Sequence, residues 1–119
     1  MLNIPQDDMA EFKGQIVDAI EDFLDEKGIT VINPERDEYN KEAGYGPGEN
    51  EVALFGTDYD LIADEAEDFI KDGNENLIAR NAITTLDWIL KAKGSRTITK
   101  DEEKQVQEKI NEVISHWNR

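Results

Sequence analysis

Apolar residues recur at helical spacing in four stretches of the chain, and this pattern predicts four helices. The first helix spans about 5–27 and ends at Gly28, because a glycine after the last apolar position is a common helix stop. The others span about 57–72, about 74–93, and from Thr99 onward. The residues expected on the apolar faces of the first two helices are Met9, Phe12, Ile16, Ala19, Ile20, Phe23, Leu61, Ile62, Ala66, Phe69 and Ile70.

Two of the predicted helices begin at residues typical of caps. Thr57 or Asp58 is expected to cap the second helix, and Thr99 with Glu102 matches a capping box that opens the last one. The apolar positions of the last helix step by four, three and four residues, which suits packing against one neighbouring helix. They are Val106, Ile110, Val113 and Trp117.

Two short apolar stretches, the first of them β-branched, lie between the first and second helices. Residues 29–32 and 52–55 are predicted strands, separated by the acidic, glycine-rich connection 33–50. Their simplest pairing is an antiparallel hairpin, which is marginal in water unless helices cover it. The sequence therefore predicts a mostly helical α+β fold of order α-β-β-α-α-α, in a single domain over 1–119.

Two apolar residues lie on the side of the third helix opposite its main apolar stripe. Either the third helix is buried on both sides, with Leu77 and Trp88 in a second apolar layer, or Trp88 is exposed and contacts a partner. Central helices of small domains are often apolar on both sides, so a core position is the preferred interpretation.

The chain is strongly acidic, with 28 acidic and 13 basic residues and a net charge of −15. The charge is uneven, since residues 1–76 carry 22 acidic and 5 basic residues while residues 77–119 carry 6 and 8. This distribution argues against binding nucleic acid or an anionic membrane through the first two thirds of the chain. A protein with a basic surface is the natural partner.

The acidic residues of the first two predicted helices fall on exposed sides, opposite the apolar faces. Neighbouring carboxylates four residues apart lie about 6 Å from one another, close to the separation of successive backbone phosphates. An ordinary solvated acidic face is the alternative interpretation. The candidate partner-binding residues are Asp7, Glu11, Asp18, Asp22 and Asp25 on the first helix, with Asp60, Asp64, Glu67 and Asp68 on the second.

No catalytic, metal or cofactor site is predicted from the sequence. The chain has no cysteine and one histidine, His116, which is expected to be a surface residue because it lacks placed partners. Asp58, Asp60 and Asp64 could suit a hard cation, but a calcium-loop pattern is absent and a helix-cap role is preferred.

A cluster of bases surrounds the connection between the last two predicted helices. Its members could complement the end of a helix or meet the acidic half of a second copy. They are Lys91, Lys93, Arg96, Lys100 and Lys104.

Through these rows of carboxylates, the chain resembles a class of proteins, the small acidic inhibitors that phages and mobile elements use against host nucleases. This class includes anti-CRISPR and anti-restriction proteins that mimic DNA. The stretch Ala53–Leu61 is also similar to small proteins of such elements. This class shares no common motif, so the resemblance assigns no individual residue. The basic C-terminal third of the present chain differs from a uniformly acidic mimic.

We therefore expect a non-enzymatic cytoplasmic protein that occupies the basic nucleic-acid-binding groove of a host defence or nucleic-acid enzyme. It binds neither nucleic acid directly nor membranes, and it is a monomer or a weak homodimer. The alternative is a protein–protein interaction or regulatory module without nucleic-acid mimicry, in which Trp88 or the Trp117 seam forms the contact.

Overall fold

The computed structural model describes residues 2–32, 51–54, 56–93 and 96–117. Short 3-10 helices at Gln6–Asp8 (η1) and Glu75–Leu77 (η2) precede the first and third α-helices. The four helices predicted from apolar spacing are confirmed, with their ends shifted by a few residues. They are α1 (Met9–Glu26), α2 (Gly56–Lys71), α3 (Ile78–Lys93) and α4 (Lys100–Trp117).

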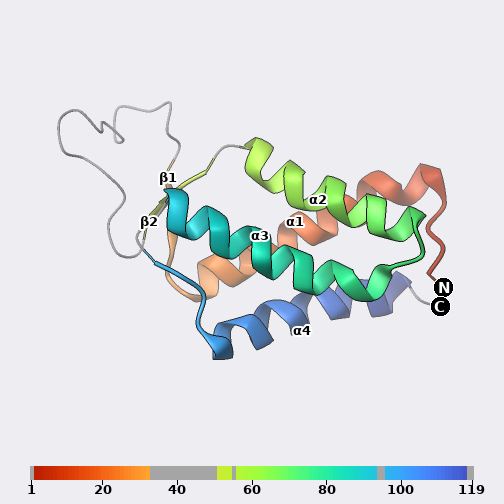
Figure 1. Ribbon diagram of the computed structural model, residues 1–119. Coiled ribbons are helices and arrows are strands. Elements are labelled where there is room, and N and C mark those ends of the chain that lie inside the picture. Colours follow the sequence, from red (N-terminus) through yellow and green to blue (C-terminus); the bar gives the residue numbers. More distant parts are fainter. Residues whose placement is uncertain (1, 33–50, 55, 94–95, 118–119) are drawn as a thin grey trace.

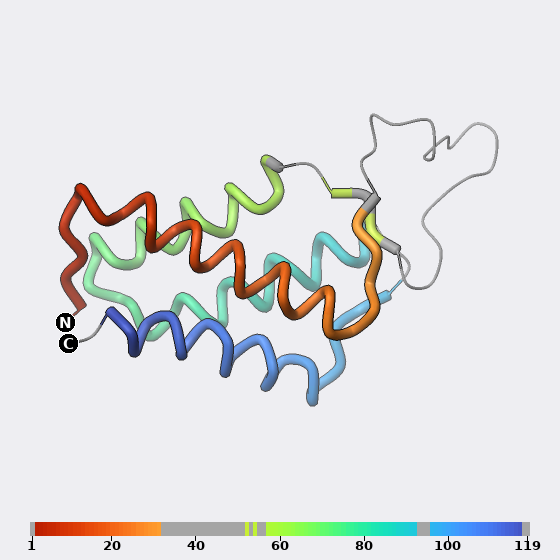
Figure 2. The backbone as a smooth tube through the Cα atoms, turned by 180° about the vertical axis from the view of Figure 1, so that it is seen from behind, coloured from red at the N-terminus to blue at the C-terminus, as the bar shows by residue number. Residues whose placement is uncertain are grey.

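Successive helices run in opposite directions and together form a four-helix bundle (Figure 1). α1 packs against α2 and α4, and α3 packs against the same two helices. α1 and α3 therefore occupy opposite corners of the bundle. α3 is in front in Figure 1, whereas Figure 2, seen from behind, shows α1 in front.

The apolar faces of the four helices meet in one core. α1 contributes Phe12, Ile16, Ile20, Phe23 and Leu24, all almost completely buried. Burying each of these side chains stabilises the fold by roughly 1.5–3 kcal/mol relative to leaving it exposed. The main contributions of the other helices are Ile62, Ala66, Ile70, Ile78, Ala82, Leu86, Ile89, Leu90, Val106 and Ile110.

Two helices end in the same glycine motif. Gly28 and Gly73 have φ values of 68° and 74°, a conformation that residues with a Cβ adopt only at a cost. After α1, the backbone N–H of Ile29 donates to the carbonyl of Leu24 at 2.9 Å, and after α2 that of Asn74 donates to Phe69 at 2.8 Å. These bonds satisfy carbonyls that the helix itself leaves free.

The predicted α+β class with an antiparallel hairpin is wrong, because the fold is helical. The strands β1 (Thr30–Ile32) and β2 (Glu51–Ala53) hold three residues each and pair in parallel, Val31 opposite Val52. A parallel pair needs a crossover of a dozen or more residues, and the connection 33–50, which lies outside the described residues, is long enough. Buried Ile29, Val52 and Leu54 join the bundle core, so the strands close one end of the bundle instead of forming a layer (Figure 1).

Three apolar side chains that were expected in the core are exposed. Leu61 of α2 is 46% exposed, Leu77 is 40% exposed, and Trp88 of α3 is 60% exposed. Each lies on an outward side of the bundle, since the main contacts of α2 and α3 are with two neighbouring helices each, which leaves part of their surface uncovered. Ala63 is buried in α2 instead. The cap predicted at Thr57 or Asp58 is also displaced, because α2 begins at Gly56 and both residues lie in its first turn.

Candidate functional site

The five predicted acidic residues of the first helical segment form a row on its outer side, which we call the α1 stripe: Asp7, Glu11, Asp18, Asp22 and Asp25. All five are exposed. None of their carboxylates makes a hydrogen bond or a close ion pair to another residue that the structure describes, although Asp22 lies near enough to Lys109 of α4 to interact with it electrostatically. The apolar residues opposite them hold α1 in the core, so the carboxylates project from a rigid support.

The acidic residues of α2 are placed differently. Lys13 of α1 lies at the boundary between the two helices and contacts Asp64 at 2.6 Å and Glu67 at 3.1 Å. Lys71 also pairs with Glu67 at 2.7 Å. The hydrogen bond to Asp64, followed in size by the one to Glu67, raises the pKa of Lys13 above its ordinary value. The hydrogen bond from Lys71, followed in size by the one from Lys13, lowers the pKa of Glu67 below its ordinary value.

These ion pairs divide the predicted site residues into two groups. Asp64 and Glu67 are used within the molecule, and Lys13 stands between them and the α1 stripe. Asp60 and Asp68 are exposed on α2. The structure therefore does not join the two predicted stripes into one continuous array of carboxylates. Sequence spacing places residues on one helix face but does not reveal a lysine supplied by the next helix.

An open groove of about 370 Å³ runs between α1 and α4 beside the stripe. Asp18 and Asp22 line it from α1, and Glu112 lines it from α4. Ala19 and Val113 supply apolar surface. Glu112 was not among the predicted residues, because nothing in the sequence shows that α4 packs beside α1.

The basic side of this groove is provided by Lys109 and His116 of α4. Lys109 binds Glu26 at the end of α1 through a contact of 2.9 Å, which ties the two helices together. This hydrogen bond raises the pKa of Lys109 above its ordinary value, and the nearby Asp22 adds to the effect. His116 is exposed, which confirms its expected surface position.

A second hollow of about 540 Å³ lies beside the other end of the stripe. Asp25 and Glu21 of α1 line it together with Tyr59 of α2. Burial raises the pKa of Tyr59 to about 12, and the charges of Glu21 and Asp58 add to the shift. The phenol therefore stays protonated at neutral pH.

The seam of the last helix is used inside the bundle. Val106 and Ile110 are buried, and Trp117 packs on the core with its ring 6.4 Å from that of Phe12. The Trp117 indole N–H also donates to Gln15 at 2.6 Å. α4 packs against both α1 and α3, so the expectation of a single neighbour is wrong, and most of the seam is used within the chain while Val113 also lines the open groove.

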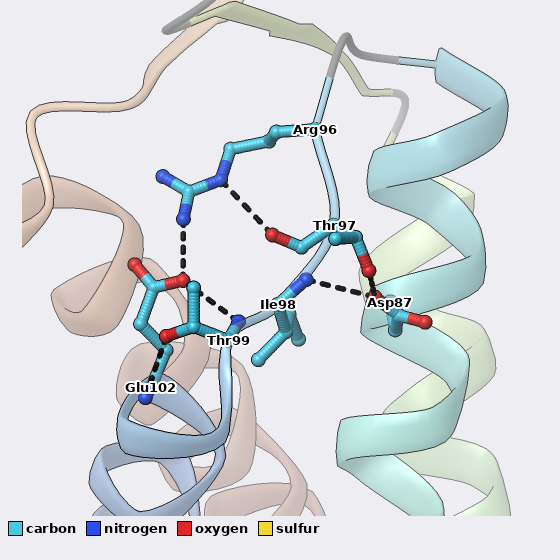
Figure 3. A network of polar contacts seen from close by, with 6 residues as sticks. All are labelled: Asp87, Arg96, Thr97, Ile98, Thr99 and Glu102. Atoms are coloured by element: carbon cyan, nitrogen blue, oxygen red, sulfur yellow. Dashed lines mark hydrogen bonds and ion pairs between the residues drawn. The ribbon is translucent and has the colours of Figure 1, made fainter.

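Two bases of the predicted cluster, Lys91 of α3 and Arg96 of the connection to α4, make contacts within the chain, and Figure 3 shows those of Arg96. Arg96 pairs with Glu102, and Lys91 pairs with Asp87 at 2.9 Å. The predicted capping box is confirmed, since the N–H of Thr99 donates to Glu102 at 3.1 Å and the N–H of Glu102 donates to the Thr99 hydroxyl at 3.2 Å.

Asp87 anchors the other end of the same connection. Its carboxylate accepts the N–H of Ile98 at 2.8 Å and the hydroxyl of Thr97 (Figure 3). Burial opposes ionisation of this carboxyl group, but these hydrogen bonds and Lys91 together hold the pKa of Asp87 below its ordinary value. Lys91 and Arg96 therefore stabilise the turn between two helices of the same chain.

Two further features are absent from the described residues. No group of three or more histidine, aspartate or glutamate side chains in this part of the chain is arranged to hold a metal ion. No helix within the described ranges is both long enough and apolar enough to cross a bilayer.

The chain matches no protein-family model, no curated protein and no solved structure.

Proposed function

We propose that this protein is a non-enzymatic inhibitor whose α1 stripe occupies the basic nucleic-acid-binding groove of another protein. The observation that supports this function is a row of exposed carboxylates on one packed helical segment, none of which makes a close ion pair within the described residues. Like charges at helical spacing destabilise a helix by a few tenths of a kcal/mol per pair. The electrostatic interaction of Asp22 with Lys109 offsets only a part of that cost.

The groove between α1 and α4 extends the proposed surface. Glu112 adds a carboxylate beside Asp18 and Asp22, and the apolar surface of Ala19 and Val113 suits the aliphatic part of a lysine or arginine side chain. Complementary charge of this kind speeds association and makes affinity fall as salt rises. This mode of action is the one that the resemblance to DNA-mimic inhibitors implies. We place it in the cytoplasm, where a chain without cysteine needs no oxidising environment.

The test is capture of partners from a cell lysate at low salt, with wild type and two charge-matched variants. The first variant carries Asp18→Lys, Asp22→Lys and Asp25→Lys on α1. We expect wild type to retain nucleic-acid-binding proteins, identified by mass spectrometry, and DNA to release them. The α1 variant should lose them while remaining folded, since exposed substitutions change stability by less than about 0.5 kcal/mol each.

The control variant carries the same change in charge on α2 and the turn that follows it, namely Asp60→Lys, Asp68→Lys and Asp72→Lys. Because Lys13 already neutralises the acidic residues beside α1, we expect this variant to retain most of the captured proteins. Equal losses with both variants would show that net charge, and not the α1 stripe, drives capture. Recovery of only metabolic or structural proteins would contradict the proposal as a whole.

A second candidate function is a protein–protein interaction module. The exposed Trp88 favours it, because solvent-exposed tryptophan is uncommon on the surfaces of monomers and enriched in interfaces. Binding through this residue should survive high salt, unlike binding through the α1 stripe. Repeating the capture with Trp88→Ala at high salt separates the two functions.

A further inference from the structure

The outward side of α3, continued by the preceding Leu77, carries a symmetrical row of exposed residues, which we call the α3 row. Its members are spaced by three, four, four and three residues, so the row reads the same in both directions about its middle member. All of them are exposed, and Trp88 is the most exposed large apolar side chain described. The row consists of Leu77, Arg80, Thr84, Trp88 and Lys91.

This row is free of carboxylates, although acidic residues outnumber basic ones by 28 to 13 in the whole chain. The one acidic residue of α3, Asp87, is only partly exposed and is bound to Lys91, Ile98 and Thr97. The row itself carries Arg80 and Lys91. Two copies of a chain with a net charge of −15 repel one another, and a face without free carboxylates is where that repulsion is least.

We propose that the α3 row is the interface of a homodimer, in which α3 packs antiparallel against α3 of a second copy. A two-fold axis at Thr84 brings each residue opposite its counterpart across the middle of the row. Arg80 of one copy then faces Trp88 of the other. Leu77 faces Lys91, and the two Thr84 residues face each other.

Each of these pairs is chemically complementary. A guanidinium over an indole ring is a cation–π contact, worth about 0.5–1 kcal/mol when exposed and about 2 kcal/mol or more when desolvated. The aliphatic part of Lys91 can cover Leu77 while its ammonium group stays in water. The hydroxyl of Thr84 already donates to the Arg80 carbonyl at 3.1 Å, so it needs no partner at the axis.

Leu61 of the neighbouring α2 is a further exposed apolar side chain. Asn81 of α3 donates to Glu65 of α2 at 2.7 Å, which fixes the relative height of the two antiparallel helices. One turn from Glu65, Leu61 lies at about the height of Thr85. Leu77 and Trp88 are both exposed in the row, which gives a second copy more apolar surface to cover than Trp88 alone.

This inference does not depend on the proposed function, because α1 and α3 occupy opposite corners of the bundle. Failure of the lysate capture would leave it standing, and a monomeric protein would leave the α1 stripe unaffected. The expected dimer is weak at low salt. It should strengthen with salt, because screening removes the repulsion between two acidic chains while the apolar and cation–π contacts remain.

The absence of cysteine permits a direct test by disulfide cross-linking. Thr84→Cys places one thiol at the proposed axis, and Ser115→Cys places one on the exposed side of α4 as the matched control. Under mild oxidation in about 1 M salt, where the Debye length is about 3 Å, we expect the Thr84 variant to cross-link at least about tenfold faster. Equal rates for the two variants would overturn the proposal.

The direction of packing is tested by mixing two further single variants, Leu77→Cys and Lys91→Cys. An antiparallel contact brings these two positions together, so the mixture should give the mixed disulfide and little of either self-linked product. Self-linked products from each variant alone would show a parallel contact and overturn the arrangement. Light scattering on uncross-linked protein at about 0.05 M and about 1 M salt should show dimer increasing with salt, and Trp88→Ala should reduce it. A wild type that stays monomeric at millimolar concentration in high salt would exclude the dimer.

Discussion

Glu102 is the buried charged residue among those that the structure describes, and its surroundings explain how it is accommodated. Burial alone would raise its pKa, but the N–H of Thr99 and the guanidinium of Arg96 bind the carboxylate (Figure 3). Together with the contact from the Thr99 hydroxyl, these interactions hold the pKa of Glu102 below its ordinary value of 4.5. The residue fastens the start of α4 to the turn that precedes it.

Replacing this carboxylate should make the fold less stable in a pH-dependent way. Because its pKa is lower in the folded state, ionised Glu102 stabilises the fold above pH 4.5, and that contribution is lost as the pH falls through the lower folded value. Glu102→Gln keeps an acceptor for Thr99 but loses the charge. We expect a loss of about 1–2 kcal/mol at neutral pH that disappears in acid, measured by urea unfolding.

The control is Glu103→Gln, the same change at the next position, where the side chain is exposed. It should change the free energy of unfolding by less than about 0.5 kcal/mol. A loss for Glu102→Gln that is the same at pH 3 and pH 7 would contradict the assigned role of its charge.

At the scale of elements, the two glycines of the α1 segment have opposite requirements. Gly14 lies within the helix on an exposed face, with nothing within 4 Å of the place where a Cβ would be. Gly28 follows the helix with a φ of 68°. Gly14 therefore carries the entropic cost of a glycine within a helix, whereas Gly28 supplies the left-handed conformation that ends the helix.

The same substitution at these positions should change stability in opposite directions. Gly14→Ala should stabilise the fold by up to about 1 kcal/mol, the difference in helix propensity. Gly28→Ala should destabilise it by about 1–2 kcal/mol, the cost of a left-handed conformation for a residue with a Cβ. Urea unfolding of both variants measures this. A stabilising Gly28→Ala would show that the turn after α1 can rearrange.

Apolar spacing was sufficient to predict the four helices and the buried face of α1, and the spacing of Thr99 and Glu102 predicted the capping box of α4, because each depends on residues close in sequence. It placed Trp88 and Leu61 in the core because spacing cannot show how many neighbours a helix has. The parallel pairing of β1 and β2 depends on a connection whose path the spacing does not specify. The α1 stripe was placed correctly on an exposed face, whereas the contacts of Lys13 and the position of Glu112 depend on helices far apart in sequence.

For the whole molecule, the bundle separates two kinds of surface. The α1 stripe is acidic and lies on one corner, while the α3 row is apolar and weakly basic and lies on the opposite corner. In the proposed dimer, the two stripes would face outward on opposite sides. One dimer could then engage two basic partners, and joining two weak sites in this way raises the apparent affinity for a partner that is itself paired.

The 3-10 helix η1 and the last turn of α4 lie at the same end of the bundle (Figures 1 and 2). Near them, the N–H of Leu2 is bound to Glu75 at 3.0 Å and the indole of Trp117 to Gln15 at 2.6 Å. The helices can therefore be joined in a different order along the chain without changing which helices are neighbours in the bundle.

A circular permutant tests this. A short flexible linker joins the old ends, and the new ends lie between Gly73 and Asn74, so every helix keeps its present neighbours. We expect its circular dichroism spectrum to match that of the parent and its thermal unfolding to remain one cooperative transition. Loss of that cooperativity would mean that the turn between α2 and α3 must be continuous for the bundle to form.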